Sequence, residues 1–152
     1  MRSTDLQQIF LESASEVLET MFFTGVVEDN AEQDKVKMVS AELTFHGNPS
    51  GRFGVQVPYK TGRTIAASFM GADECDVTEE QIGEVICELT NMICGSVLSR
   101  LEEGARFELL HPEIDMQNSD WHQIPHAVGC TFGLEEGTMT LWLQEAKPSL
   151  VA

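Results

Sequence analysis

A helical repeat of apolar side chains in the middle of the chain constrains the fold more than any other segment. Its members recur at spacings of three and four residues: Ile82, Val85, Ile86, Leu89, Ile93 and Val97. This spacing places them on one face of an α-helix. Thr78 is a good N-cap with Gln81 three residues later, as in a capping box, and Gly104 is typical of the residue that follows a helix. We therefore predict a long helix that begins after Thr78 and ends near Glu102.

A second stripe of the same helix carries polar and small residues. Glu84, Glu88, Asn91 and Gly95 also follow helical spacing, and we call these four residues the ridge. Residues three and four apart are neighbours on a helix, so Glu88 and Asn91 are expected to project side by side. Asparagine costs a few tenths of a kcal/mol relative to alanine inside a helix. The ridge is therefore a candidate functional site, and a solvated helix surface is the alternative.

The rest of the chain predicts two more helices and strands that arrive mostly in pairs. The expected helices cover residues 5–20 and 61–70, with Gly71 ending the second. The expected strands cover residues 36–45, 52–57, 107–110, 126–134 and 138–144. Residues 28–34 and 113–125 read as loops, and the chain from Pro148 reads as a tail. Gly, Pro and Asn at 46–51 favour a hairpin turn between the first two strands.

Strands that arrive in hairpins indicate an α+β fold. We expect two long helices packed on one face of a mostly antiparallel sheet built from hairpins. The 152 residues suit one compact domain, residues 1–152, and no linker divides them.

The charge of the chain restricts its partners. Nine basic and 25 acidic residues give a net charge of −16. This argues against binding to nucleic acid or to an anionic membrane surface, and it is compatible with a basic or mixed-charge protein partner. The N-terminus has no apolar signal region, and no apolar run approaches the roughly 20 residues of a membrane span.

The cysteines favour a cytoplasmic location. Cys75, Cys87, Cys94 and Cys130 form no C-x-x-C pair. Cys87 and Cys94 would lie about 10 Å apart along one helix, too far for a mutual disulfide. Free thiols in a reducing cytosol are the expected state.

Other kinds of site have weaker support in the sequence. The best metal candidates form no recognised ligand pattern: His111, Glu113, Asp115, Asp120, His122 and His126. A polar loop explains them as well. No pattern brings a cysteine and a histidine together as a nucleophile pair, and no phosphate-binding or dinucleotide fingerprint occurs. We expect no cofactor and no metal bound by this chain.

The segment from Glu88 to Gly95 resembles the signature helix of the CheC/CheX/FliY family of chemotaxis phosphatases. The signature places a Glu, then an Asn three residues later, then a Gly one turn on. Residues 66–71 before a short acidic loop, and residues 106–112 before an irregular loop and a terminal hairpin, fit the same layout. In the first helix Glu19 stands where a second signature would need Asn, so the arrangement is CheX-like, with one site. Glu84 departs mildly from the Asp or Ser that the family often has.

The resemblance implies a phosphatase acting on the aspartyl phosphate of a response-regulator (CheY-like) receiver domain. Asn91 would orient the attacking water, and Glu88 would dock to the receiver's lysine. Glu84 and Gly95 would contact the partner, Gly95 by allowing close approach. Mg²⁺ would be bound by the receiver and not by this chain, and the resemblance also suggests a homodimer.

Two alternatives belong to other functional classes. The protein could be a non-catalytic adaptor that binds receiver domains or flagellar and chemotaxis components through the same ridge. A metal-binding or redox module using residues 111–126 or the cysteines is the weaker alternative.

Overall fold

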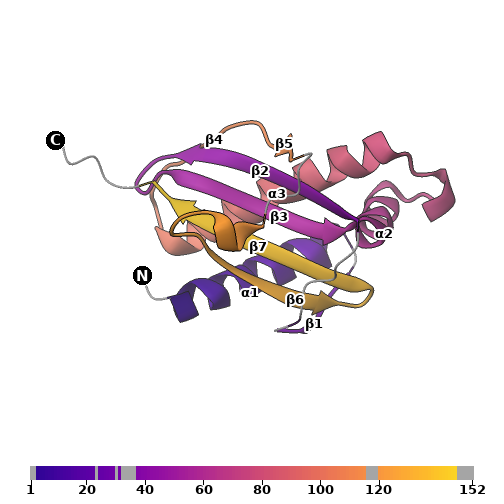
Figure 1. The fold of residues 1–152 in the computed structure, drawn as a ribbon, viewed down its shortest axis with the longest axis horizontal. Helices are drawn as coiled ribbons and strands as arrows, with labels where there is room; N and C mark the ends of the chain where they lie inside the picture. The colour runs from indigo at the N-terminus through magenta and orange to yellow at the C-terminus, as the bar shows by residue number, and fades with distance from the viewer. Residues whose placement is uncertain (1–2, 23, 30, 32–36, 116–119, 147–152) are drawn as a thin grey trace.

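A computed structural model describes residues 3–22, 24–29, 31, 37–115 and 120–146 (Figure 1). Its helices are α1 (Ser3–Met21), α2 (Tyr59–Met70) and α3 (Glu79–Leu101). Its strands are β1 (Val26–Glu28), β2 (Met38–His46), β3 (Gly51–Pro58), β4 (Glu108–Leu109), β5 (Glu113–Ile114), β6 (Val128–Leu134) and β7 (Gly137–Glu145). Two 3₁₀ turns cover Glu74–Asp76 and Trp121–Gln123.

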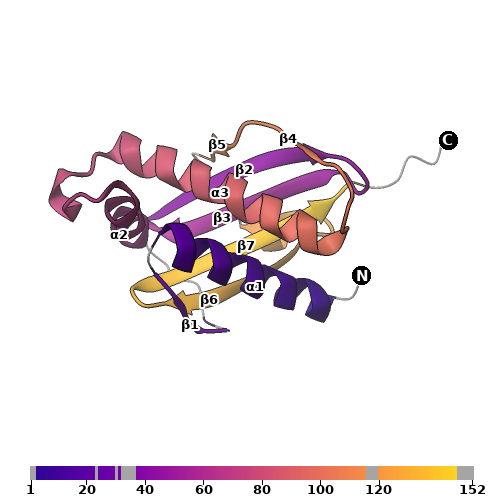
Figure 2. The same ribbon diagram turned by 180° about the vertical axis from the view of Figure 1, so that it is seen from behind.

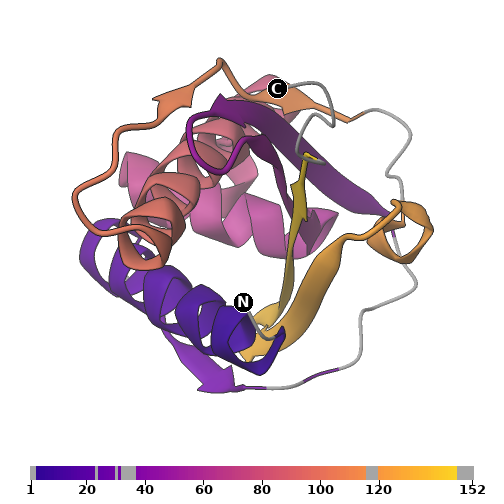
Figure 3. The same ribbon diagram turned by 90° about the vertical axis from the view of Figure 1, so that its left-hand side faces the viewer.

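The seven strands form one antiparallel sheet. Its order is β1-β6-β7-β3-β2-β4, and β5 also pairs with β2. The β2–β3 and β6–β7 hairpins meet at the central β3–β7 pair, where Phe53 lies opposite Leu143. Helices α1 and α3 cover one face of the sheet (Figure 2), and the sheet curves around them (Figure 3). The predicted α+β architecture is thus confirmed.

The core lies between the two long helices and the sheet. Phe10 of α1 meets Phe53 of β3 edge to face, with ring centroids 6.1 Å apart, and both side chains are fully buried. From α3, the apolar stripe predicted by the sequence is buried throughout. Burial of each large apolar side chain contributes about 1.5–3 kcal/mol, so this packing holds α3 firmly in place.

Helix α3 begins with the predicted capping box. Thr78 Oγ1 accepts a hydrogen bond from the Gln81 backbone N–H at 3.1 Å, and Gln81 Oε1 accepts one from the Thr78 N–H at 2.9 Å. The helix ends at Leu101, and Gly104 follows in the left-handed conformation with φ of 80°.

Helix α3 departs from the expectation that no segment approaches the length and hydropathy of a membrane span. By these two criteria alone it could cross a membrane, with a mean hydropathy of 1.3 in its most apolar window. Half of that window is buried inside the structure, as in the core helix of a globular domain.

Three short elements lie where the sequence predicted loops. Glu28 ends β1, and β5 with the turn Trp121–Gln123 lies within residues 113–125. The prediction of loops at these positions is wrong. Elements of two or three residues are too short to show a periodic pattern in the sequence. Part of the predicted loop 28–34, the start of the predicted strand 36–45 and the predicted tail from Pro148 fall outside the described residues.

Candidate functional site

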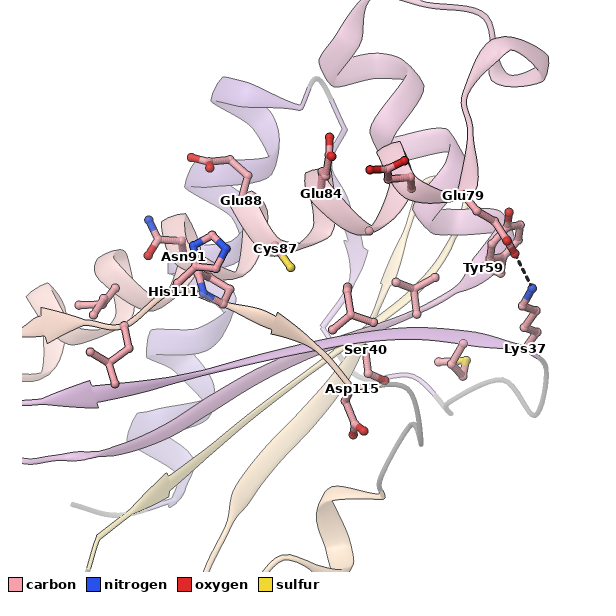
Figure 4. A pocket seen from close by; sticks show the side chains of 18 residues that line it. Lys37, Ser40, Tyr59, Glu79, Glu84, Cys87, Glu88, Asn91, His111 and Asp115 are labelled. Atoms are coloured by element: carbon pink, nitrogen blue, oxygen red, sulfur yellow. Dashed lines mark hydrogen bonds and ion pairs between the residues drawn. The ribbon is translucent and has the colours of Figure 1, made fainter.

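The ridge lies on the face of α3 that points away from the core. Glu84 and Glu88 are exposed, while Asn91 and Gly95 are half-buried. Figure 4 shows Glu84, Glu88 and Asn91 in succession along the helix. Leu89, the residue after Glu88, is fully buried on the opposite face. The side chains that the sequence grouped are therefore neighbours on a helix that the core holds fixed.

The polar side chains of the ridge are free to bind a partner. Within the described part of the chain, no hydrogen bond or ion pair engages Glu84, Glu88 or Asn91. Thr90, between Glu88 and Asn91, is fully buried and donates its hydroxyl to the Ile86 carbonyl oxygen at 2.7 Å. Thr90 therefore has a structural role, whereas Glu84, Glu88 and Asn91 have no such bond among the described residues.

Gly95 differs from the glycines that this fold requires. Among the described residues, a Cβ at Gly95 would meet no atom within 4 Å apart from its chain neighbours and the adjacent backbone of its own helix. At Gly54 a Cβ would collide with the Trp142 ring. Glycine inside a helix costs about 1 kcal/mol relative to alanine, and the packing of this chain does not explain why Gly95 carries that cost.

A groove of about 1030 Å³ runs beside the ridge (Figure 4), and we call it the α3 groove. Helix α3 forms one wall, with Glu84, Glu88 and Asn91 among its lining residues. The opposite wall is the segment 109–115, which carries the end of β4 and all of β5. His111 lies at the end of the groove where Asn91 lies. Gly95 is not among the lining residues.

The sequence did not reveal this groove. Its second wall is held by the pairing of β4 and β5 with β2, which places Leu109 opposite Phe45 and Ile114 opposite Ala41. Such contacts join residues more than sixty positions apart and leave no periodic pattern. No feature of the sequence would have placed His111 at the same end of the groove as Asn91.

One end of the groove is lined by a cluster of charged and aromatic side chains. Lys37 Nζ lies 2.9 Å from Glu79 Oε1 and 4.3 Å from the Tyr59 ring centroid. The hydrogen bond between the two charges lowers the pKa of Glu79 and raises the pKa of Lys37. Both groups are exposed, so the pair orders this end of the groove more than it stabilises the fold.

The cysteines are free and protonated where they are buried. Burial raises the pKa of Cys94 to about 12 and that of Cys130 to about 11. Cys87 lines the α3 groove, and burial, aided by Glu113 and Glu84, raises its pKa too. Protonated thiols are weak nucleophiles and poor metal ligands, so these surroundings make the Cys87 thiol less reactive than an exposed one.

The metal candidates of residues 111–126 do not gather into one cluster. Among the described residues no three His, Cys, Asp or Glu side chains are placed to hold a metal ion. His122 Nδ1 lies 2.7 Å from Asp120 Oδ1, and this hydrogen bond lowers the pKa of Asp120. His111 lies apart from that pair, in the α3 groove.

Comparison with known structures identifies the same architecture in chemotaxis proteins. CheX from Desulfovibrio desulfuricans is 21% identical, with a TM-score of 0.72 over 93% of this chain and 99% of that one. CheX from Vibrio vulnificus is 19% identical, with a TM-score of 0.74 over 96% and 99%. The CheX–CheY–BeF₃–Mg²⁺ complex from Borrelia burgdorferi matches at 20% identity, with a TM-score of 0.67 over 92% and 97%.

Two sequence comparisons give different results. The search of curated protein sequences finds no match to the chain. The family model described as chemotaxis phosphatase CheX matches residues 39–132, which include the whole ridge and both walls of the α3 groove. This match covers more than half of the chain, and it agrees with the CheX-like signature at Glu88 and Asn91. The chain therefore belongs to the CheX family of chemotaxis phosphatases.

Proposed function

We propose that this protein hydrolyses the aspartyl phosphate of a CheY-like receiver domain, and that the ridge is its active site. The observation that carries the proposal is the Glu88–Asn91 pair. Both side chains project from one surface of a helix whose other face is buried, and neither has a partner among the described residues. A family of chemotaxis phosphatases supplies the reaction class.

Asn91 acts by positioning a water molecule. An aspartyl phosphate is a reactive acyl phosphate, so water placed in line with the leaving oxygen suffices for attack at phosphorus. The new P–O bond forms as the acyl P–O bond breaks, and the products are inorganic phosphate and the receiver's free carboxylate. The carboxamide of Asn91 can accept from and donate to that water, and it does not titrate.

Glu88 docks the receiver beside Asn91. Its exposed carboxylate is available for a charge-assisted hydrogen bond to a receiver lysine. Glu84, one turn earlier, extends the docking surface, and Gly95, one turn later, lets the receiver approach the helix closely. We place the Mg²⁺ on the receiver, where it would neutralise the phosphoryl oxygens; the Borrelia burgdorferi CheX–CheY complex contains Mg²⁺.

The test is phosphate release from a phosphorylated receiver domain. Asn91→Ala should lower the rate roughly 100-fold, the cost of a misplaced reacting group, while receiver binding stays near that of the wild type. Glu88→Ala should weaken both binding and turnover. Gln8→Ala is the matched control, since Gln8 is an exposed carboxamide on α1 bonded only to Glu12 among the described residues.

Two outcomes would contradict the proposal. Full activity of Asn91→Ala would remove the water-positioning role. A wild-type protein that binds phosphorylated receivers without releasing phosphate would be the adaptor that the sequence left open as an alternative.

A further inference from the structure

A row of carboxylates lines the rim of the α3 groove. Glu80, Glu84 and Glu88 stand four residues apart, so each is the neighbour of the next on the helix surface. All three are exposed and line the groove, and within the described residues none forms an ion pair. Like charges at this spacing destabilise a helix. The helix dipole compensates Glu80 in the first turn but not Glu84 or Glu88.

The groove below this row is lined by apolar side chains. Val39, Cys87 and Ile114 line it and are half-buried. An apolar floor beneath a carboxylate rim suits a lysine or arginine side chain, because the methylene stem packs on the floor while the charged head reaches the rim. The volume of about 1030 Å³ exceeds what one side chain fills, so the groove suits a segment of several residues.

The position of the groove restricts what can occupy it. Glu88 and Asn91 line it together with Glu80. A receiver whose phosphoryl group lies at Asn91 must therefore lie over the mouth of the groove. A second copy of this chain, with its net charge of −16, would be repelled by the same rim.

We propose that the α3 groove receives a basic, extended segment of the phosphorylated receiver, whose lysine or arginine side chains pair with Glu80 and Glu84. This inference rests on the proposed function and adds to it a rule for choosing partners. Glu80 and Asn91 are eleven residues apart, or about 16 Å along the helix axis. An extended segment of about five residues spans that length, so the positive charges should lie within roughly 16 Å of the receiver's phosphorylation site.

The test measures affinity separately from turnover. The probe is a receiver that the wild type dephosphorylates, loaded with BeF₃ and Mg²⁺ as in the Borrelia burgdorferi complex. The double variant Glu80→Gln/Glu84→Gln removes both charges and keeps the side-chain shapes. Its Kd should rise roughly 2- to 30-fold at low ionic strength, the range expected for two exposed ion pairs, and the difference should shrink as salt screens them. The control is Glu102→Gln/Glu103→Gln, which removes two exposed carboxylates beyond the end of α3 and outside the groove.

Exchange of charges identifies the occupant. Glu84→Lys should weaken binding further, and changing a basic residue of the receiver segment to glutamate should restore it. An unchanged Kd for the double variant, or an equal rise in the control, would overturn the inference while phosphate release by the wild type leaves the proposed function standing. A wild type that dephosphorylates no receiver domain would overturn both the proposed function and this inference.

Discussion

Gly95→Ala should raise the stability of the protein while it lowers receiver binding. Beyond its own stretch of helix, the added Cβ would meet no atom of the described residues within 4 Å, so their packing is not disturbed. Alanine is favoured over glycine inside a helix by about 1 kcal/mol. For a domain of this size, that gain corresponds to a rise in Tm of about 2–4 °C.

The same methyl group should weaken the complex if the receiver packs against the bare helix backbone. Forcing one extra carbon into a tight contact costs typically 1–3 kcal/mol. At about 1.4 kcal/mol per factor of ten, Kd should rise roughly 5- to 150-fold. Stability and affinity therefore change in opposite directions, which general damage to the fold cannot produce.

The assay pairs thermal unfolding with binding of the BeF₃–Mg²⁺-loaded receiver. Ser68→Ala is the control, because it lies in α2, does not line the α3 groove and also exchanges a residue for the better helix former. That variant should gain a smaller Tm increase and keep its affinity. A Gly95→Ala protein that binds the receiver as tightly as the wild type would refute the close-approach role of Gly95.

Two further predictions concern the fold that supports the site. Thr78→Ala removes the hydroxyl of the capping box and should lower the free energy of unfolding by about 1 kcal/mol, measured by urea titration. Burial holds the pKa of Cys94 at about 12, above the 9.0 of an unperturbed thiol. The folded state therefore keeps a proton that the unfolded state loses, so stability present below pH 9 should decline as pH rises from 9 towards 12. Cys94→Ala, compared with the wild type over that range by urea titration, should show a shallower decline; an equal slope would contradict the assignment.

The sequence predicts this fold best where its patterns are long. Helix α3 has an apolar stripe over several turns and a capping box at Thr78, so both its existence and its start could be predicted. The two main hairpins follow from alternation and turn residues. The order of strands could not be predicted, because the central contact pairs β3 with β7, at Phe53 and Leu143, ninety positions apart. No local pattern specifies a pairing of that range.

The candidate site likewise has one part that the sequence predicts and one part that depends on the fold. Helical spacing alone places Glu88 and Asn91 on one surface, and the structure has them there. The α3 groove depends on where residues 109–115 return to the edge of β2, and that contact involves strands of two residues each. The acidic row at Glu80, Glu84 and Glu88 can be seen in the sequence. Its proposed role in binding basic side chains depends on the apolar floor of the groove, which forms only in the folded chain.

The contrast between the two long helices explains why one site and not two is expected. On α1, Glu16 and Glu12 lie beside Arg100 of α3, with Glu12 Oε2 3.7 Å from Arg100 Nε and Glu16 in direct contact. These carboxylates are engaged in holding the helices together, and Glu19 occupies the position where a second signature would need a carboxamide. On α3, Glu84 and Glu88 have no cationic partner among the described residues, and Leu89 and Ile93 are fully buried on the opposite face. Catalysis by positioning requires such a rigid support, and within the part of the chain that the structure describes only α3 combines it with a Glu–Asn pair free of other contacts.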